Sequence, residues 1–209
     1  MIEKYLRLAS LGDVYRLTFK LKDPEAYVEW TEENYDYVRY NPRKDIKRYG
    51  LSVTSLDGEL SGIPDLDSLV EYNRENNTHI SERDCNVPTV LYKESRIKKF
   101  LEPFKEQLFR SHILRLDPSG YFPIHRDSFV NIDCFRIIVP LSNCNPPSVY
   151  FIVDEKITSN WDLGRMYFVN TIKEHTLFNA SFSPSYWLVL NVDLSNTAIE
   201  TVLRNVVVR

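Results

Sequence analysis

The sequence predicts an α+β fold, in which a jelly-roll-like core of antiparallel strands carries flanking helices, mainly from the N-terminal side. Beyond about residue 112, short apolar segments alternate with turn residues at a spacing typical of antiparallel sandwiches and jelly rolls. The composition agrees, because 13 tyrosines and 11 phenylalanines stand against only 6 glycines, and aromatic residues suit half-buried pleated surfaces. The expected strands of this core cover residues 112–116, 135–141, 149–153, 166–169 and 186–192.

The N-terminal half is expected to contribute helices and one strand. Asp23 and Pro24 predict a helix start, with an N-cap followed by proline at the first helical position. Pro103 predicts a break or kink in a later helix. Ser195 predicts the cap of a C-terminal helix. The other expected elements are helices over 24–36, 65–74 and 94–108 and a strand over 50–57.

A chain of 209 residues that has no linker rich in proline, glycine or serine is expected to fold as one domain. Within it we expect a mixed α/β part packed on the core, then the jelly-roll core, then a C-terminal helix. The expected bounds of these three parts are 1–107, 108–196 and 197–209.

Charge and composition argue against several classes of protein. The 26 basic and 29 acidic side chains give a net charge of −3, whereas a nucleic-acid-binding surface is usually basic. No apolar run approaches the roughly 20 residues that cross a bilayer. The three cysteines lack the spacing of a zinc site, and the first residues lack the pattern of a secretory signal. We therefore expect a cytoplasmic protein with free thiols and no membrane partner.

A candidate metal site lies in the β-rich half. His125 and Asp127 are two residues apart, so on an extended strand both project to the same face and can hold one cation. His175 precedes another expected strand, and distant strands become neighbours in a jelly roll. Two imidazoles and one carboxylate leave coordination positions open, which suits non-haem Fe(II) better than structural zinc. Spacing alone leaves open that these are an ordinary histidine and a turn carboxylate.

Other kinds of site are not indicated by the sequence. It has no glycine-rich phosphate loop, no Ser-His-Asp order and no catalytic-cysteine signature. His112 is expected to be a core histidine, and Arg126 is expected to point away from the metal. Trp161 and Trp187 are expected to serve mainly in packing.

Three segments taken in order resemble one known family. They are Gly120-Tyr-Phe-Pro-Ile-His125-Arg-Asp127, Phe135-Arg136-Ile-Ile-Val-Pro140-Leu141 and Glu174-His175-Thr-Leu-Phe178-Asn179. The pattern resembles the aspartyl/asparaginyl β-hydroxylase-like branch of the Fe(II)/2-oxoglutarate-dependent oxygenases, over about residues 110–193. The preceding residues resemble the N-terminal flank of small phage-type hydroxylase-like proteins. The resemblance implies a double-stranded β-helix, or cupin-like, core.

The resemblance also implies an activity and its cofactors. His125, Asp127 and His175 would hold Fe(II), 2-oxoglutarate would chelate the metal, and dioxygen would take the last open position. Oxidative decarboxylation of 2-oxoglutarate to succinate would accompany hydroxylation of an amino acid, a peptide or a protein side chain.

The remote carboxylate of 2-oxoglutarate requires a cation, and arginine matches a carboxylate best. The family often places this arginine shortly after the distal histidine, where this chain has Ser185 and no arginine. Arg136 matches an arginine that neighbours the cosubstrate in the family, and Arg115 lies on the strand before the metal motif. Arg136, Arg115 and Ser185 are therefore the expected cosubstrate-binding residues, with structural ion pairs as the alternative for both arginines.

Two other functions stay open because that downstream arginine is missing. One is a cupin-like metal-binding protein with different or no catalysis. The other is a jelly-roll interaction module with a vestigial pocket.

Overall fold

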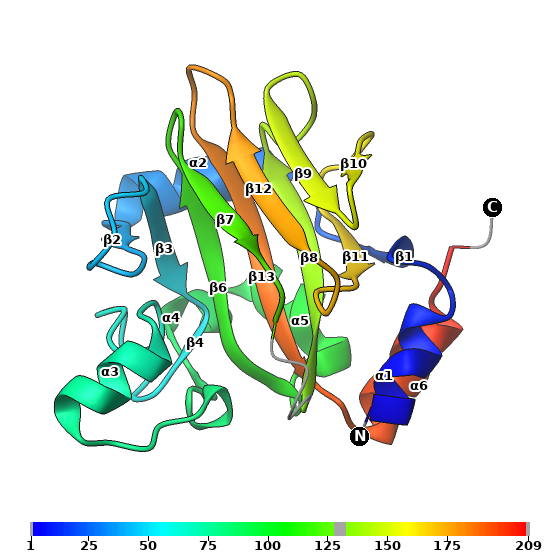
Figure 1. Ribbon diagram of the computed structural model, residues 1–209, viewed down its shortest axis with the longest axis horizontal. Coiled ribbons are helices and arrows are strands. Elements are labelled where there is room, and N and C mark those ends of the chain that lie inside the picture. The colour runs from blue at the N-terminus through cyan, green and yellow to red at the C-terminus, as the bar shows by residue number, and fades with distance from the viewer. Residues whose placement is uncertain (1, 128–132, 208–209) are drawn as a thin grey trace.

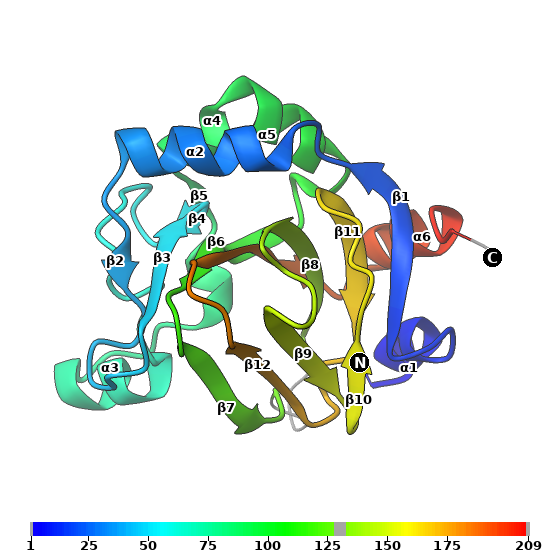
Figure 2. The same cartoon turned by 90° about the horizontal axis from the view of Figure 1, so that it is seen from above.

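Two antiparallel sheets form the centre of the molecule in the computed structural model, which describes residues 2–127 and 133–207. The strands of the large sheet are β1 (Val14–Lys20), β2 (Val38–Arg39), β3 (Arg48–Ser52), β6 (Leu108–Leu116), β8 (Cys134–Ser142), β11 (Arg165–Val169) and β13 (Ser185–Asp193). Those of the small sheet are β7 (Tyr121–His125), β9 (Val149–Val153), β10 (Lys156–Thr158) and β12 (His175–Asn179). The orders are β1-β11-β8-β13-β6-β3-β2 and β10-β9-β12-β7, and the small sheet faces the large one (Figures 1 and 2).

The strands of the second half change sheet as the chain advances. The large sheet receives β6, β8, β11 and β13, and the small sheet receives β7, β9 and β12 between them. This alternation agrees with the expected jelly-roll class. The expectation of a mostly β structure with a few helices is confirmed, whereas the double-stranded β-helix stays a prediction that the alternation favours.

Three strands of the large sheet come from the first 107 residues, which were expected to pack on the core. β1 pairs with β11 at one edge, and β3 pairs with β6 near the other (Figure 2). Leu17 in β1 is fully buried. The N-terminal part therefore contributes strands to the large sheet. The expected boundary at residue 108 does not divide the sheet from a separate layer.

The helices lie around the sheets. They are α1 (Ile2–Ala9), α2 (Pro24–Asn34), α3 (Leu69–Asn76), α4 (Val90–Lys93), α5 (Ser95–Leu101) and α6 (Asn196–Arg204), with 3-10 turns at Glu82–Asp84 and Glu102–Phe104 and a two-stranded ladder of β4 (Thr54–Ser55) and β5 (Val87–Pro88). Helices α2, α4 and α5 cover the outer face of the large sheet, and α1 packs beside α6 (Figures 1 and 2).

Several expected bounds differ from the structure. The first long helix begins at Pro24 as predicted, but Asp23 adopts a left-handed conformation and its side chain makes no capping hydrogen bond to the described residues. The expected helix over 94–108 ends at Leu101 because a 3-10 turn containing Pro103 follows and a strand begins at Leu108. Residues 65–68 form no helix, and Ser68 instead caps α3.

Two further bounds were also too broad. The expected strand over 50–57 is divided into β3 and β4. The C-terminal part expected over 197–209 contains a helix, α6, that ends at Arg204 and is capped by Ser195 as predicted, whereas residues 208 and 209 lie outside the described residues.

Separate apolar clusters fill the two faces of the large sheet. One lies between this sheet and the helices and includes Leu17 and Ile137. The other lies between the two sheets and includes Trp161 and Trp187. These tryptophans pack together with Phe151, as expected of packing residues.

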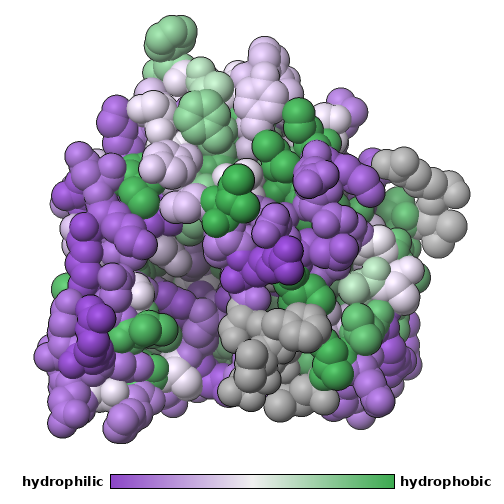
Figure 3. All heavy atoms as spheres, in the orientation of Figure 1, coloured by the Kyte–Doolittle hydropathy of each residue, from purple (hydrophilic) through white to green (hydrophobic). Residues whose placement is uncertain are grey.

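The outer face of the small sheet is open to solvent. Tyr121, Ile124 and Phe178 are exposed there, and Figure 3 shows hydrophobic side chains scattered among hydrophilic ones on this side of the molecule. One covered and one solvated face is common in antiparallel sheets. None of the described helices is long and apolar enough to cross a membrane, and Cys85, Cys134 and Cys144 are free thiols.

Candidate metal centre

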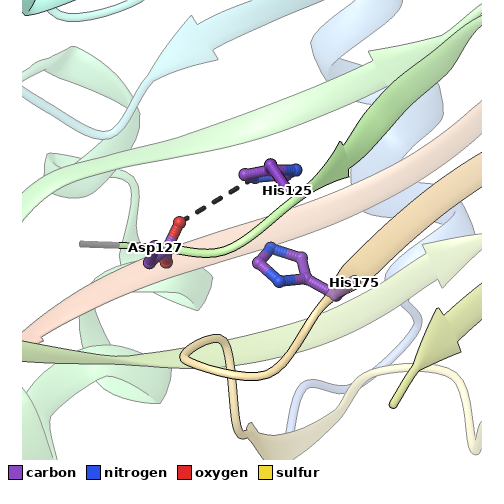
Figure 4. Close-up of side chains that lie close together, drawn as sticks. All are labelled: His125, Asp127 and His175. Carbon is purple, nitrogen blue, oxygen red and sulfur yellow. Dashed lines mark ion pairs between the residues drawn. The ribbon is translucent and has the colours of Figure 1, made fainter. Parts of the chain in front are cut away.

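The structure brings His125, Asp127 and His175 together at one end of the small sheet. His125 is the last residue of β7 and His175 the first of β12, and the two residues are partners in the antiparallel register. Their ring centroids lie 4.2 Å apart. One ligand atom from each of the three residues lies within 4.8 Å of the others, close enough to hold one metal ion. Figure 4 shows the three side chains turned toward one another.

Asp127 reaches this cluster from beyond the strand. The spacing of two residues predicts His125 and Asp127 on one extended strand, but β7 ends at His125. The backbone N–H of Asp127 donates to the carbonyl oxygen of Thr171 at 2.9 Å, which holds the chain after the strand. Asp127 Oδ1 then lies 3.9 Å from His125 Nε2 (Figure 4).

Backbone carbonyls orient both imidazoles. His125 Nδ1 lies 2.7 Å from the carbonyl oxygen of Pro123, and His175 Nδ1 lies 3.0 Å from that of Lys173. A neutral histidine that donates from Nδ1 to a carbonyl keeps its lone pair on Nε2, the form that binds a metal. Burial, and then the neighbouring His125, lower the pKa of His175, so this ring stays neutral.

Arg136 holds the carboxylate of Asp127 from the other side. Its Nε lies 3.2 Å from Asp127 Oδ2, while Oδ1 faces His125. The other donors of Arg136 reach Glu82 and the sulfur of Cys134. Because all three branches of the guanidinium have partners, Arg136 is placed to orient Asp127.

Glu82 lies between two buried arginines, Arg110 and Arg136. Although burial alone would raise its pKa, the two guanidinium groups lower the pKa of Glu82 to about 2. Glu82 is therefore ionised and offsets part of the positive charge behind the metal centre. His112 lies on the same wall, where burial and then Arg110 lower its pKa to about 3, so that it is neutral as the expected core histidine would be.

The cluster opens into a cavity of about 170 Å³ between the two sheets. Its wall has a polar end near Arg136 and an apolar remainder. The polar wall comprises Glu82, Arg110, His112, Arg136 and Asn191, and the apolar wall includes Leu114, Phe122, Ile138, Phe151, Leu177 and Val189. A wider, open depression of about 930 Å³ adjoins the same cluster and is bordered by Leu69, Val70 and Arg126.

The structure does not bring Arg115 and Ser185 to this cavity wall. Arg115 donates to Asp117 at 2.7 Å and pairs with Glu32 of α2, on the helix-covered face of the large sheet. This is the ion pair that the sequence analysis kept as the alternative. Ser185 is buried and its Oγ accepts a hydrogen bond from Trp187 Nε1 at 2.8 Å. Arg126 is exposed and pairs with Glu174.

Sequence reasoning missed Arg48 at the start of β3. This side chain is only 5% exposed. Its guanidinium carbon lies 4.1 Å from the ring centroid of Phe122 and 5.2 Å from that of Tyr40, and both rings line the cavity. The sequence feature that could have indicated Arg48 is its place just before the expected strand over 50–57. In the structure that strand, β3, begins two residues earlier, at Arg48 itself.

No family model matches this chain, and no curated protein matches it in sequence. Solved structures do match it. A prolyl-4-hydroxylase from Pseudomonas putida is 11% identical, with a TM-score of 0.51 over 92% of this chain and 98% of the other. HygX from Streptomyces hygroscopicus, solved with nickel, 2-oxoglutarate and hygromycin B bound, is also 11% identical, with a TM-score of 0.51 over 92% and 87%. The chain shares the fold of these two proteins.

Proposed function

We propose that this protein is a non-haem Fe(II)- and 2-oxoglutarate-dependent dioxygenase that hydroxylates an amino acid, a peptide or a protein side chain. The observation that carries the proposal is the convergence of His125, Asp127 and His175 within 4.8 Å. The fold that this chain shares with a prolyl hydroxylase and with a protein that binds nickel and 2-oxoglutarate supports it. Membership of the aspartyl/asparaginyl β-hydroxylase-like branch belongs to the same proposal.

The donor set fits Fe(II). Two imidazoles and one carboxylate form a three-ligand face that leaves positions open, and this combination is diagnostic of Fe(II) oxygenases. Both imidazoles are oriented through Nδ1, and Asp127 is oriented through Arg136. Such outer hydrogen bonds fix the ligands before the metal arrives. When bound, Fe(II) with 2-oxoglutarate supplies the oxidation of a C–H bond by dioxygen.

The rest of the chain positions and encloses the reactants. The cavity of about 170 Å³ is small and mostly apolar, which suits a keto acid beside the metal. The open depression that borders two of these ligands, His125 and Asp127, is wider, and we assign the amino acid or peptide substrate to it. This division gives the two organic reactants separate approaches to one ion.

The proposal is tested by binding and turnover. Anaerobic protein with Fe(II) and 2-oxoglutarate is expected to develop the weak visible charge-transfer band of a keto acid chelate. Exposure to oxygen is then expected to yield succinate. His125→Ala and Asp127→Ala are expected to abolish the band, whereas His79→Ala, at an exposed position, is the matched control and keeps it.

Two results would contradict the proposal. Absence of the band in the unaltered protein would exclude a keto acid chelate, and metal binding without it would favour the cupin-like alternative. An unchanged band in Asp127→Ala would show that the metal lies elsewhere.

A further inference from the structure

Arg48 is a buried cation without an anionic partner. It is 5% exposed, and within residues 2–127 and 133–207 it makes no ion pair, while its Nε lacks a hydrogen-bond partner. Burying an unpaired charge is costly, and contacts with the faces of Phe122 and Tyr40 offset only part of that cost. Burial accordingly lowers the pKa of Arg48. Such a group calls for an anion from outside the chain.

The backbone directs this side chain into the space between the sheets. Arg48 is the register partner of Leu116 in β6, and Leu116 is the partner of Ser185 in β13. Paired residues on adjacent antiparallel strands project to the same face. Leu116 belongs to the apolar cluster between the sheets. The side chains of Arg48, Leu116 and Ser185 therefore all face the space between the sheets.

The other arginines around the cavity are already paired. Arg136 contacts Asp127 and Glu82, and Arg110 contacts Glu82. Arg115 pairs with Glu32 and Asp117 on the opposite face of the sheet. Among these arginines of the described chain, Arg48 alone has its guanidinium free to take a carboxylate.

Phe122 lies beside both Arg48 and the candidate metal centre. The ring centroid of Phe122 lies 6.0 Å from that of His125 and 4.1 Å from the guanidinium carbon of Arg48. One aromatic ring of the cavity wall therefore contacts both the candidate metal ligand and the cation. Most of the cavity lining is apolar, as the methylene groups between two carboxylates require.

We propose that Arg48 binds the remote carboxylate of the 2-oxo acid and so selects a dicarboxylate over a monocarboxylate. The inference rests on the proposed function for the identity of the acid. Arginine suits this role because its planar fork matches a carboxylate with two parallel hydrogen bonds. The missing arginine near Ser185 is thereby replaced from β3, in the same row of the sheet.

The test compares two acids that differ only at the remote end. 2-Oxoglutarate and 2-oxopentanoate are titrated calorimetrically into the full-length protein loaded with Ni(II), which binds without turnover. The unaltered protein is expected to bind 2-oxoglutarate about 100-fold more tightly, as for a desolvated charge pair. Arg48→Met is expected to lose this preference while its affinity for 2-oxopentanoate stays within about threefold.

Control variants separate this role from others. Arg39→Met removes an exposed arginine of the neighbouring strand β2 and is expected to keep the preference. Arg48→Lys keeps the positive charge but lacks the planar guanidinium that forms two parallel hydrogen bonds. It is expected to keep part of the preference for 2-oxoglutarate. Arg48→Met is also expected to unfold at the same or a higher temperature without ligand, because it removes an unpaired buried charge. A purely structural Arg48 would lower that temperature.

Failure of this inference is distinguishable from failure of the proposed function. If the unaltered protein binds neither acid, the proposed function fails. If it prefers 2-oxoglutarate and Arg48→Met does so equally, Arg48 is not the anchor and the function stands. Loss of the preference in Arg115→Met alone would overturn the inference, as would failure of both Arg48 variants to fold.

Discussion

Arg136 connects the candidate metal centre to a carboxylate outside it. Its guanidinium contacts Asp127 on one side and Glu82 on the other. The sequence analysis expected Arg136 beside the cosubstrate, and the structure places it in the wall of the cavity. Its contacts favour the role of a positioning residue for Asp127. Direct contact with the cosubstrate stays a prediction.

Replacing Arg136 with methionine is expected to weaken metal binding. Without the Nε contact, Asp127 loses its fixed orientation, and loss of such an outer contact typically costs 10–100-fold in metal affinity. Calorimetry with Ni(II) measures the change. Arg126→Met is the matched control, since Arg126 lies between the ligands in sequence but is exposed. Equal Ni(II) affinities for the Arg136 variant and the unaltered protein would show that Arg136 is not the residue that orients Asp127 for metal binding.

Glu82 predicts a specific dependence of stability on pH. Its pKa in the folded protein, about 2, lies below the ordinary value of 4.5. The stabilisation is therefore present above pH 4.5 and is lost as the pH falls toward 2. It corresponds to about 3 kcal/mol at neutral pH.

Glu82→Gln is thus expected to lower the free energy of unfolding by about 3 kcal/mol at pH 7, with the difference from the unaltered protein shrinking in acid. Urea unfolding across this pH range measures it. Glu200→Gln, at an exposed helix pair, is expected to change stability by less than about 0.5 kcal/mol. A difference in stability that does not depend on pH would show that the ionised carboxylate of Glu82 is not the source of the stabilisation.

The two sheets that surround the candidate site are built from strands of both halves of the chain. The small sheet carries His125 and His175 on adjacent strands, and the large sheet closes the other side of the cavity. The large sheet begins with β1, far from the site in sequence, and continues through β3, which carries Arg48. The N-terminal strands thus contribute to both stability and the pocket.

Leu17→Ala in β1 tests the contribution of the N-terminal strand. Leu17 is fully buried, and truncating a buried leucine typically costs 2–5 kcal/mol. Urea unfolding is expected to show a loss in this range. Leu11→Ala, at a leucine that is 50% exposed, is expected to cost much less. Equal losses for the two variants would mean that β1 packs no more tightly than the surface.

At the scale of the whole molecule, a bound ion joins β7, β12 and the segment after β7. A ligand that binds only the folded state at 100 times its Kd stabilises it by about 2.7 kcal/mol. For a domain of this size that raises the unfolding temperature by roughly 5–10 °C. Thermal unfolding with Ni(II) is expected to show this rise, and excess chelator is expected to reverse it. A similar rise in His175→Ala would place the ion elsewhere.

The sequence predicted β6, β8, β9, β11 and β13, because each is a short apolar segment between turn residues, but it did not predict β7, β10 or β12. Residues 149–153 match β9 residue for residue. It predicted the three candidate ligands because the motif order was informative. It did not predict Glu82 in the cavity wall or Arg48 against two aromatic residues of that wall, because their roles depend on pairings between strands and loops that no local pattern records. Arg115 was misleading, since an arginine on a strand can face either side of the sheet.

The cluster of aromatic rings beside the cavity gives the molecule an intrinsic optical reporter. Trp161 and Trp187 lie 5.3 Å apart, and each contacts Phe151, whose ring lines the cavity. The remaining tryptophan, Trp30, lies on α2 outside the sheets. Indole fluorescence from the first two should therefore dim when a paramagnetic ion or a coloured chelate occupies the site, so that binding can be followed without attaching any dye.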